Sequence, residues 1–374
     1  MADSRTRATW AAEPLDEILN GNVKRPTPTL MQRTDGVSLL YQAKVHSLHG
    51  ESESAKSLIA QAECVRVLES GGRVLFMDFE SDPISVVSRL LSMGATAVMI
   101  RKGFTYVRPE FDPESFGEAE LDAFERHLAK RYTLAVIDGV TASFSVYGLN
   151  SMDNGDTMKW GLKLPLKLAS ATGAAVLVID HVTKSSDGRG RFAIGAQMKM
   201  AFLTGAAFTA KMTQQLGVGR VGTVEIRVGK DREGMVRSHS SDFRSSDQTA
   251  AIAMAVFDST EKDRLHYSLE PPGGEAAGTR GDSVVMAIIE YLADGRRRSK
   301  NDIEKAMKSA GHPRDRVRTA LRNAQESGAV SFGPGPRNSI QLWVDEAPEP
   351  SPGTLVVTVD FSQFPDDPSP RRTA

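Results

Sequence analysis

Residues 50–57 combine a glycine, two acids, three serines and a lysine at a spacing that can bind phosphate groups. They read Gly50-Glu51-Ser52-Glu53-Ser54-Ala55-Lys56-Ser57. This order follows the pattern G-x-x-x-x-G-K-[ST], with Ala55 at the position of the second glycine. Glycine allows a sharp turn at a strand end, and the N–H groups of the turn and the next helix attract an anion. We expect Lys56 to reach the β- and γ-phosphates and the Ser57 hydroxyl to ligate Mg²⁺.

Two features of this loop disfavour phosphate binding. The Cβ atom of Ala55 costs little if its φ is negative and more if φ is positive. Glu51 and Glu53 place negative charge beside a triphosphate, which is unfavourable unless both side chains point outward. The alternative interpretation is a serine-rich polar turn.

The sequence around the loop predicts a strand before it and a helix after it. Residues 45–48 are typical of a short strand. Apolar residues then recur at helical spacing, and the pattern ends at a pair of glycines, Gly71-Gly72. A strand therefore enters the loop and a helix leaves it.

A second strand, predicted over residues 73–78, ends in a run of carboxylates that Pro83 stops. Ligands bind at the carboxyl ends of strands in open α/β sheets. Among Asp78, Glu80 and Asp82, we favour Glu80 as the group that polarises a water molecule, because Phe79 should point to the opposite face. The alternative is a solvated strand end without chemistry.

Two further apolar strands end in polar residues. Residues 133–138 end in Asp138, and residues 174–181 end in Asp180-His181. A carboxylate at the tip of a strand beside a phosphate loop can hold the Mg²⁺ shell. The repeated order of strand, loop and helix predicts an α/β fold with a mainly parallel sheet and right-handed crossovers.

Composition limits the remaining possibilities. The 374 residues suggest about two domains plus tails, and the net charge of −1 confines any nucleic-acid surface to a local region. Cys64 is the only cysteine, which excludes intramolecular disulfides and fits a reducing cytosol. No apolar run reaches the length of a membrane span, and the N-terminus lacks a signal-peptide core. We therefore expect a cytoplasmic protein that does not bind a membrane.

The region after residue 270 predicts a second folded unit. A Pro/Gly-rich linker (271–281) precedes three helices and a β-hairpin (282–344), the order of a winged helix-turn-helix. Residues 280–344 hold twelve Lys or Arg against seven Asp or Glu. The third helix carries the basic residues expected to contact DNA: Arg314, Arg316, Arg318 and Arg322. An ordinary solvated surface or a protein-binding winged helix is the alternative.

The last segment, residues 345–374, is rich in proline and acids and predicts a disordered tail. Residues 355–364 form an apolar island within it. This island is interpreted either as a peptide that binds a replication-protein partner or as a spacer.

With the loop, Glu80, Asp138, His181 and a Lys230-Asp231-Arg232 run at a late strand end, the chain resembles the RecA-like ATPases. It is most similar to the RepA-like hexameric helicases of phages and plasmids, over residues 13 to about 260. The resemblance implies an N-terminal arm (1–30) and a RecA-like P-loop ATPase domain (31–270). Ala55, and Gly139 after Asp138, depart from the family pattern.

The resemblance also implies roles for individual residues. Glu80 would be the catalytic carboxylate, His181 the sensor of the γ-phosphate, and Asp138 with Ser57 the Mg²⁺ ligands. Lys230 and Arg232 would form the finger that reaches a neighbouring subunit's nucleotide. Arg189 and Arg191 would lie in the loop that binds single-stranded DNA.

The implied function is an ATP-dependent DNA helicase that assembles as a ring, expected to be a hexamer, and moves on single-stranded DNA in replication. Its cofactors would be ATP and Mg²⁺, and its winged helix would contact duplex DNA. Two alternatives stay open. One is a recombinase-like or helicase-loader ATPase without unwinding activity. The other is a DNA-binding replication initiator or regulator with a degenerate ATPase switch, which Ala55 favours.

Overall fold

A computed structural model describes residues 12–181, 198–272, 283–312, 314–326, 330–335 and 340–344. The chain divides into two compact units, residues 1–286 and 287–374. The expectations for Arg189 and Arg191, for most of the linker and for the acidic tail fall outside the described residues.

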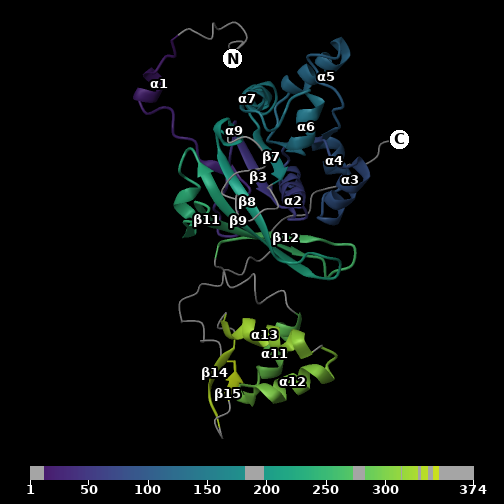
Figure 1. The fold of residues 1–374 in the computed structure, drawn as a ribbon, viewed down its shortest axis with the longest axis vertical. Coiled ribbons are helices and arrows are strands. Elements are labelled where there is room, and N and C mark those ends of the chain that lie inside the picture. Colours follow the sequence, from purple (N-terminus) through teal and green to yellow (C-terminus); the bar gives the residue numbers. More distant parts are fainter. Residues whose placement is uncertain are drawn as a thin grey trace, which may run out of the picture. The chain divides into compact units, whose positions relative to one another are not determined.

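The first unit alternates helices and strands (Figure 1). Its strands are β1 (Pro28–Leu30), β2 (Leu40–Tyr41), β3 (Val45–Gly50), β4 (Val74–Asp78), β5 (Phe104–Val107), β6 (Leu134–Asp138), β7 (Ala175–His181), β8 (Ala206–Gln214), β9 (Val221–Asp231), β10 (Ser241–Arg244), β11 (Thr249–Asp258) and β12 (His266–Glu270). Its helices are α1 (Asp16–Leu19), α2 (Lys56–Glu69), α3 (Pro83–Ser92), α4 (Ala97–Gly103), α5 (Glu118–Leu128), α6 (Val140–Val146), α7 (Asn154–Lys163), α8 (Pro165–Thr172), α9 (Met198–Ala201) and the 3₁₀ turn η2 (Arg237–His239).

One 10-stranded sheet organises this unit, in the order β10-β11-β9-β8-β3-β7-β6-β4-β5, with β12 beside β11. From β8 to β5 the neighbouring strands pair in parallel. From β8 through β9 to β11, and on to β10 and β12, they pair antiparallel. The mainly parallel half confirms the expected α/β class and fits the core of a P-loop NTPase. It also brings the ends of β3, β4, β6 and β7 to one edge.

Helices cover both faces of the parallel strands (Figure 1). Alternate residues of a strand point to opposite faces, so Phe76 and Val136 pack with α2 and α3, whereas Leu75 and Ile137 pack with α5 to α8. Trp160 of α7 is fully buried in the second core, where its ring contacts Phe144 at a centroid distance of 5.0 Å. The two cores hold the strand ends, and therefore the site, in place.

The local sequence did not predict two short helices. These are α4, which precedes β5, and α6, which follows β6. Helix α6 is rich in serine and β-branched residues, which have low helix propensity. It forms because Val140, Ser143 and Phe144 are buried against the sheet. Helices α7 and α8 meet at Leu164, and Pro165 begins α8 at its first turn, where its missing N–H costs nothing.

The last two strands of the first unit differ in their place in the sheet. Only β12 lies at an edge, because β11 pairs with β9 on one side and with β10 and β12 on the other.

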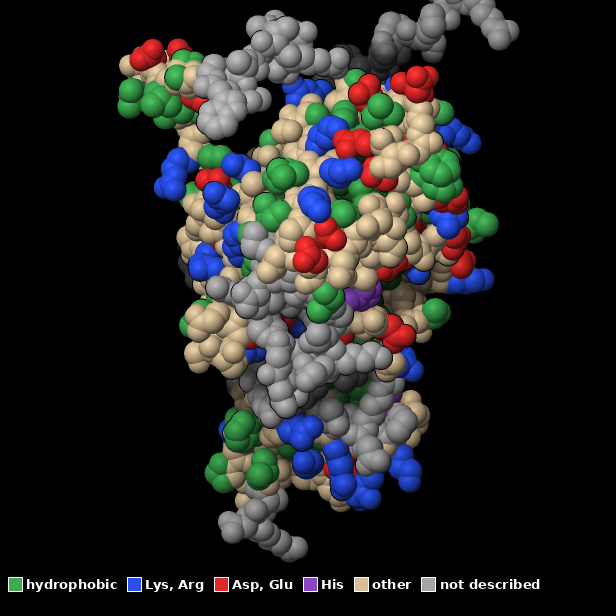
Figure 2. Space-filling view, turned by 45° about the horizontal axis from the view of Figure 1, so that its top comes forward, with side chains coloured by type: hydrophobic (Ala, Val, Ile, Leu, Met, Phe, Trp, Pro, Cys, Tyr) green, Lys and Arg blue, Asp and Glu red, His purple; other side chains and the backbone are tan. Residues whose placement is uncertain are grey.

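The second unit, together with residues 283–286 that begin its first helix, contains α11 (Ser283–Leu292), α12 (Lys300–Ser309) and α13 (Arg314–Glu326), with β13 (Arg298–Ser299), β14 (Ser331–Pro334) and β15 (Ile340–Trp343) in a sheet of order β13-β15-β14. The helices and the β14–β15 hairpin follow the expected order, and β13 is an addition. Ser299 caps α12 by accepting a hydrogen bond from the Asp302 N–H. Lys and Arg side chains gather on the face of this unit seen in Figure 2.

Over the part of the chain that the structure describes, every helix is too short or too polar to cross a bilayer.

Candidate functional site

The 50–57 loop joins the end of β3 to the first turn of α2, as the sequence predicted. Gly50 is needed for close packing, because a Cβ atom there would lie 2.3 Å from the Ala210 carbonyl oxygen. Lys56 is 5% exposed, and its Nζ donates hydrogen bonds to the carbonyls of Gly50 (3.1 Å) and Glu51 (2.6 Å) and to Ser54 Oγ (3.2 Å). Burial lowers the pKa of Lys56, and nearby carboxylates oppose that shift. The ammonium group is thus held on the concave side of the loop, where phosphate would bind.

Left-handed backbone shapes this loop. Glu53 has φ 63° and Ala55 has φ 61°. Such residues turn successive N–H groups inward and make an anion-binding concavity. At position 55 the conformation is one that glycine adopts freely, so the alanine carries backbone strain. The glycine expected from the pattern is therefore absent at a position whose backbone conformation favours it.

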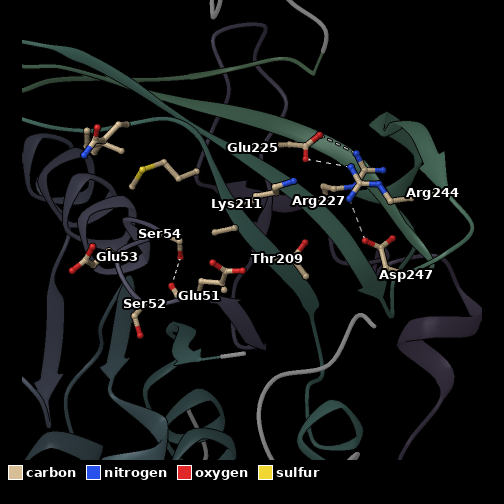
Figure 3. A pocket seen from close by; sticks show the side chains of 15 residues that line it. Glu51, Ser52, Glu53, Ser54, Thr209, Lys211, Glu225, Arg227, Arg244 and Asp247 are labelled. Carbon is tan, nitrogen blue, oxygen red and sulfur yellow. Dashed lines mark hydrogen bonds and ion pairs between the residues drawn. The ribbon is translucent and has the colours of Figure 1, made fainter. Parts of the chain in front are cut away.

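Glu51 points away from the phosphate side of the loop. It lines a separate cavity of about 640 Å³ between the loop and strands β8 to β10. Figure 3 shows Glu51 and Ser54 facing Thr209 and Lys211 there, with Arg227 paired to Glu225 farther along. Glu53 lines both this cavity and the one on the phosphate side. The acidic side chains of the loop thus point largely toward strands β8 to β10.

Asp138 lies next to Ser57 at the end of β6. Its Oδ1 accepts a hydrogen bond from Ser57 Oγ at 3.1 Å. Burial, with the negative charges of Asp78 and Glu80, raises the pKa of Asp138 to about 7, although Ser57 and Lys56 oppose the shift. A divalent cation would relieve this concentration of carboxylates.

The oxygen atoms of Ser57 and Asp138 are the hard ligands that Mg²⁺ prefers. Among the described residues, no group of three or more His, Cys, Asp or Glu is arranged to hold a metal by itself. That fits Mg²⁺, which is usually bound by one or two protein ligands, waters and substrate phosphates.

Glu80 is the acid after β4 that faces the site. Asp78 instead accepts hydrogen bonds from the N–H of Ser81 (2.7 Å) and the hydroxyl of Tyr106 (2.7 Å). Asp82 caps α3. Glu80 Oε2 lies 3.5 Å from His181 Nε2 at the end of β7. The remaining carboxylate and the histidine thus meet where the two strands end.

These groups line one pocket of about 410 Å³. It is lined by loop residues 53–58 and by Glu80, Arg89, Asp138, Ile179, His181, Met212 and Leu216. Arg89, in the last turn of α3, was not predicted. The sequence does show a basic residue in the helix that follows Glu80. The helical pattern alone, however, does not show which side chain of that helix reaches the pocket.

Lys230 and Arg232 lie outside this pocket. Lys230 Nζ donates hydrogen bonds to the backbone carbonyls of Met200 and Leu203, so it is engaged within its own chain. Arg232 follows the end of β9, and its side chain is exposed.

The arginines of the third helix are partly neutralised. Arg314 and Arg318 both donate to Glu304 of α12, at 3.1 and 2.9 Å, while their side chains stay 64% and 50% exposed. Arg322 is exposed, and Arg316 lies on the same helix. The shared carboxylate fixes α13 on α12 and orients the two guanidinium groups.

Comparison with known proteins bears on the first unit. Residues 12–187 match the family model described as an AAA domain. This match covers slightly less than half of the chain and supports a P-loop ATPase domain, in agreement with the loop, the parallel sheet and the pocket. The comparison with curated proteins found no match.

Proposed function

We propose that the protein is an ATP-dependent DNA helicase or translocase of the RepA-like type, which hydrolyses ATP at the subunit interfaces of a ring. The observation that carries the proposal is the convergence of Lys56, Ser57, Glu80, Asp138 and His181 on one pocket. Their positions in the sequence span more than a hundred residues, and each comes from the end of a different parallel strand or from the loop.

Each group has a chemical task in this proposal. Lys56 binds the β- and γ-phosphates of ATP, and Ser57 and Asp138 hold Mg²⁺, which neutralises phosphate charge when bound. Glu80 accepts a hydrogen bond from the attacking water and orients it toward the γ-phosphorus. His181, beside Glu80, contacts the γ-phosphate and registers its loss.

The pocket of one chain contains Lys56 and Arg89 as its cations, among the residues that the structure describes. The proposal therefore assigns Arg232 to the pocket of a neighbouring subunit. An arginine supplied from another chain can raise the rate of phosphoryl transfer by about 10³–10⁵-fold. This arrangement makes ring assembly a condition of hydrolysis.

The second unit is proposed to be a winged helix that contacts duplex DNA. Its support is the exposed basic surface around α13 and the hairpin formed by β14 and β15. Arg314, Arg318 and Arg322 would contact phosphates, which predicts an affinity that falls steeply with salt. The ring would move on single-stranded DNA through basic loops that include Arg189 and Arg191.

The proposal is tested by strand displacement on a forked DNA substrate, with ATP hydrolysis measured in the same reaction. A helicase consumes ATP faster when single-stranded DNA is present and separates the strands. Stimulated hydrolysis without strand separation would identify a recombinase-like or loader ATPase instead.

One observation favours a different function. The left-handed conformation of Ala55 strains the phosphate loop. A DNA-binding initiator or regulator that uses nucleotide as a slow switch would tolerate that strain. Footprints on defined duplex sites, together with negligible ATP hydrolysis, would support this second candidate.

A further inference from the structure

A buried ion pair lies directly behind the proposed γ-phosphate site. Asp180, the residue before His181 in β7, is 2% exposed, and Lys199 of α9 is 5% exposed. Lys199 Nζ donates to Asp180 Oδ2 at 2.7 Å. Lys199 also lies 5.6 Å from the ring centroid of Phe144 in α6. Neither residue lines the 410 Å³ pocket.

The other oxygen of Asp180 holds the backbone that carries the site. Its Oδ1 accepts hydrogen bonds from the His181 N–H at 2.9 Å and from Thr141 Oγ1 at 3.3 Å. Thr141 lies two residues after Gly139, where a Cβ atom would lie 2.5 Å from Glu80 Cγ. Glu80 in turn lies 3.5 Å from His181.

These contacts connect His181 and Glu80 through Asp180. One carboxylate is bonded to the backbone of His181 and, through Thr141, to the turn that supports Glu80. Lys199 balances the negative charge of that carboxylate and opposes the rise in the Asp180 pKa that burial causes. A shift of Asp180 would move the histidine and the support of the catalytic carboxylate together.

We propose that Asp180, fixed by Lys199, is a positioning residue that holds His181 and the Gly139–Thr141 turn in register for sensing and hydrolysis of the γ-phosphate. This inference rests on the proposed ATPase function. Displacements of about 1 Å at a reacting centre can lower a rate by about a hundredfold. The pair therefore sets the rate and the discrimination between ATP and ADP, and leaves the affinity for ADP unchanged.

Two double variants separate positioning from simple structural support. Asp180→Asn with Lys199→Met removes both buried charges but keeps an amide oxygen that can accept from His181 N–H and Thr141. Asp180→Leu with Lys199→Met also removes both charges, and it removes the acceptor. Methionine preserves the length of the lysine stem and packs well against the Phe144 ring.

The measurements are the affinities for a non-hydrolysable ATP analogue and for ADP, followed by kcat for ATP. We expect the Asn variant to keep the analogue-to-ADP affinity ratio and most of kcat. We expect the Leu variant to lose the preference for the analogue and about ten- to a hundredfold in kcat, with ADP affinity retained. An unchanged ratio and kcat in the Leu variant would overturn the inference.

A matched control measures the effect of losing a buried cation elsewhere. Arg33 is also 5% exposed, and it bonds to Asp35 and to the carbonyl of Ile252, away from the pocket. Arg33→Met should lower stability and leave the affinity ratio and kcat unchanged. If the Leu variant does not fold, Thr141→Val removes one donor from an exposed residue; we expect it to reduce kcat, and an unaltered kcat there would overturn the inference.

Measurements on the wild-type chain separate the proposed function from the inference about Asp180. Wild-type protein that prefers the analogue but does not hydrolyse ATP contradicts the proposed function, and the affinity ratio still tests Asp180. Wild-type protein that hydrolyses ATP but binds both nucleotides equally is consistent with the proposed function and overturns the inference about Asp180.

Discussion

Gly139 packs directly against Glu80: a Cβ atom at residue 139 would lie 2.5 Å from Glu80 Cγ, and the φ of Gly139 is +95°. The glycine after Asp138 departs from the family pattern, and this contact gives a physical reason for it. The turn after β6 therefore helps to fix the position of the proposed catalytic carboxylate.

Gly139→Ala should therefore affect both stability and catalysis. We expect a loss of roughly 1–2 kcal/mol from the left-handed backbone, and a fall in kcat because Glu80 is displaced. Gly148→Ala is the matched control, since Gly148 has φ +63° and no atom within 4 Å of its Cβ position. Urea denaturation and ATP hydrolysis measure the two effects. Equal kcat values in the two variants would contradict the assigned contact.

Glu80 and Asp82, the two acids after β4, should differ sharply in function. Glu80→Gln should lower kcat by about 10²–10⁴-fold, the usual contribution of a general base, and leave nucleotide binding intact. Asp82→Asn should leave kcat near its normal value, because Asp82 only caps α3. Single-turnover hydrolysis with a parallel binding titration measures both. If Asp82→Asn were the inactive variant, the assignment of Glu80 would be wrong.

The features that the sequence predicts correctly depend on residues close together in the chain. The loop, its flanking strand and helix, and the strand ends at Glu80, Asp138 and His181 follow from motif spacing and apolar runs. The structure places all of them at one edge of the sheet. Strands of this buried, β-branched type have few alternative conformations, so the sequence predicts them well.

Tertiary contacts decide the features that the sequence did not predict. Helix α6 is stable because Val140 and Phe144 enter the core, which no local propensity reveals. The pair of Asp180 with Lys199 depends on how α9 packs beneath β7, and Arg89 depends on the rotation of α3. The sequence alone does not give the sign of the Ala55 φ, on which the strain at this residue depends.

Replacement of Ala55 by glycine should relieve the loop. Relief of left-handed strain contributes roughly 1–2 kcal/mol, and the greater freedom of the unfolded chain offsets about 0.4–1 kcal/mol. The net effect is a modest stabilisation. Ala43→Gly is the control, because Ala43 has φ 55° in a turn outside the pocket. Both variants should be stabilised in urea, and tighter nucleotide binding should appear only with Ala55→Gly. A weaker affinity would argue against a strained phosphate loop.

Glu63 of α2 should make stability depend on pH. Burial raises its pKa to about 7, above the value of 4.5 for an unperturbed glutamate. Between these values the folded chain binds a proton that the unfolded chain does not, so this group's contribution to stability falls as pH rises from about 4.5 to 7. Glu63→Gln removes that dependence and keeps an acceptor for the Met31 N–H.

The free energy of unfolding of Glu63→Gln relative to wild type should therefore rise with pH and level off above pH 7. The shift corresponds to a change on the order of 3 kcal/mol. Urea denaturation at pH 5, 6, 7 and 8 measures it. A difference that stays constant across this range would show that Glu63 is ionised normally in the folded protein.

In the proposed ring, ATP held by Lys56 in one chain is hydrolysed with the help of Arg232 from the next. The most direct test of this proposal is ATP hydrolysis by Lys56→Ala and Arg232→Ala proteins, alone and mixed, in the presence of single-stranded DNA. The account predicts that each protein alone is inactive and that mixed rings recover activity, because some interfaces then join an intact Lys56 to an intact Arg232. Mixed particles of ring size that stay inactive, or turnover retained by Lys56→Ala alone, would contradict it.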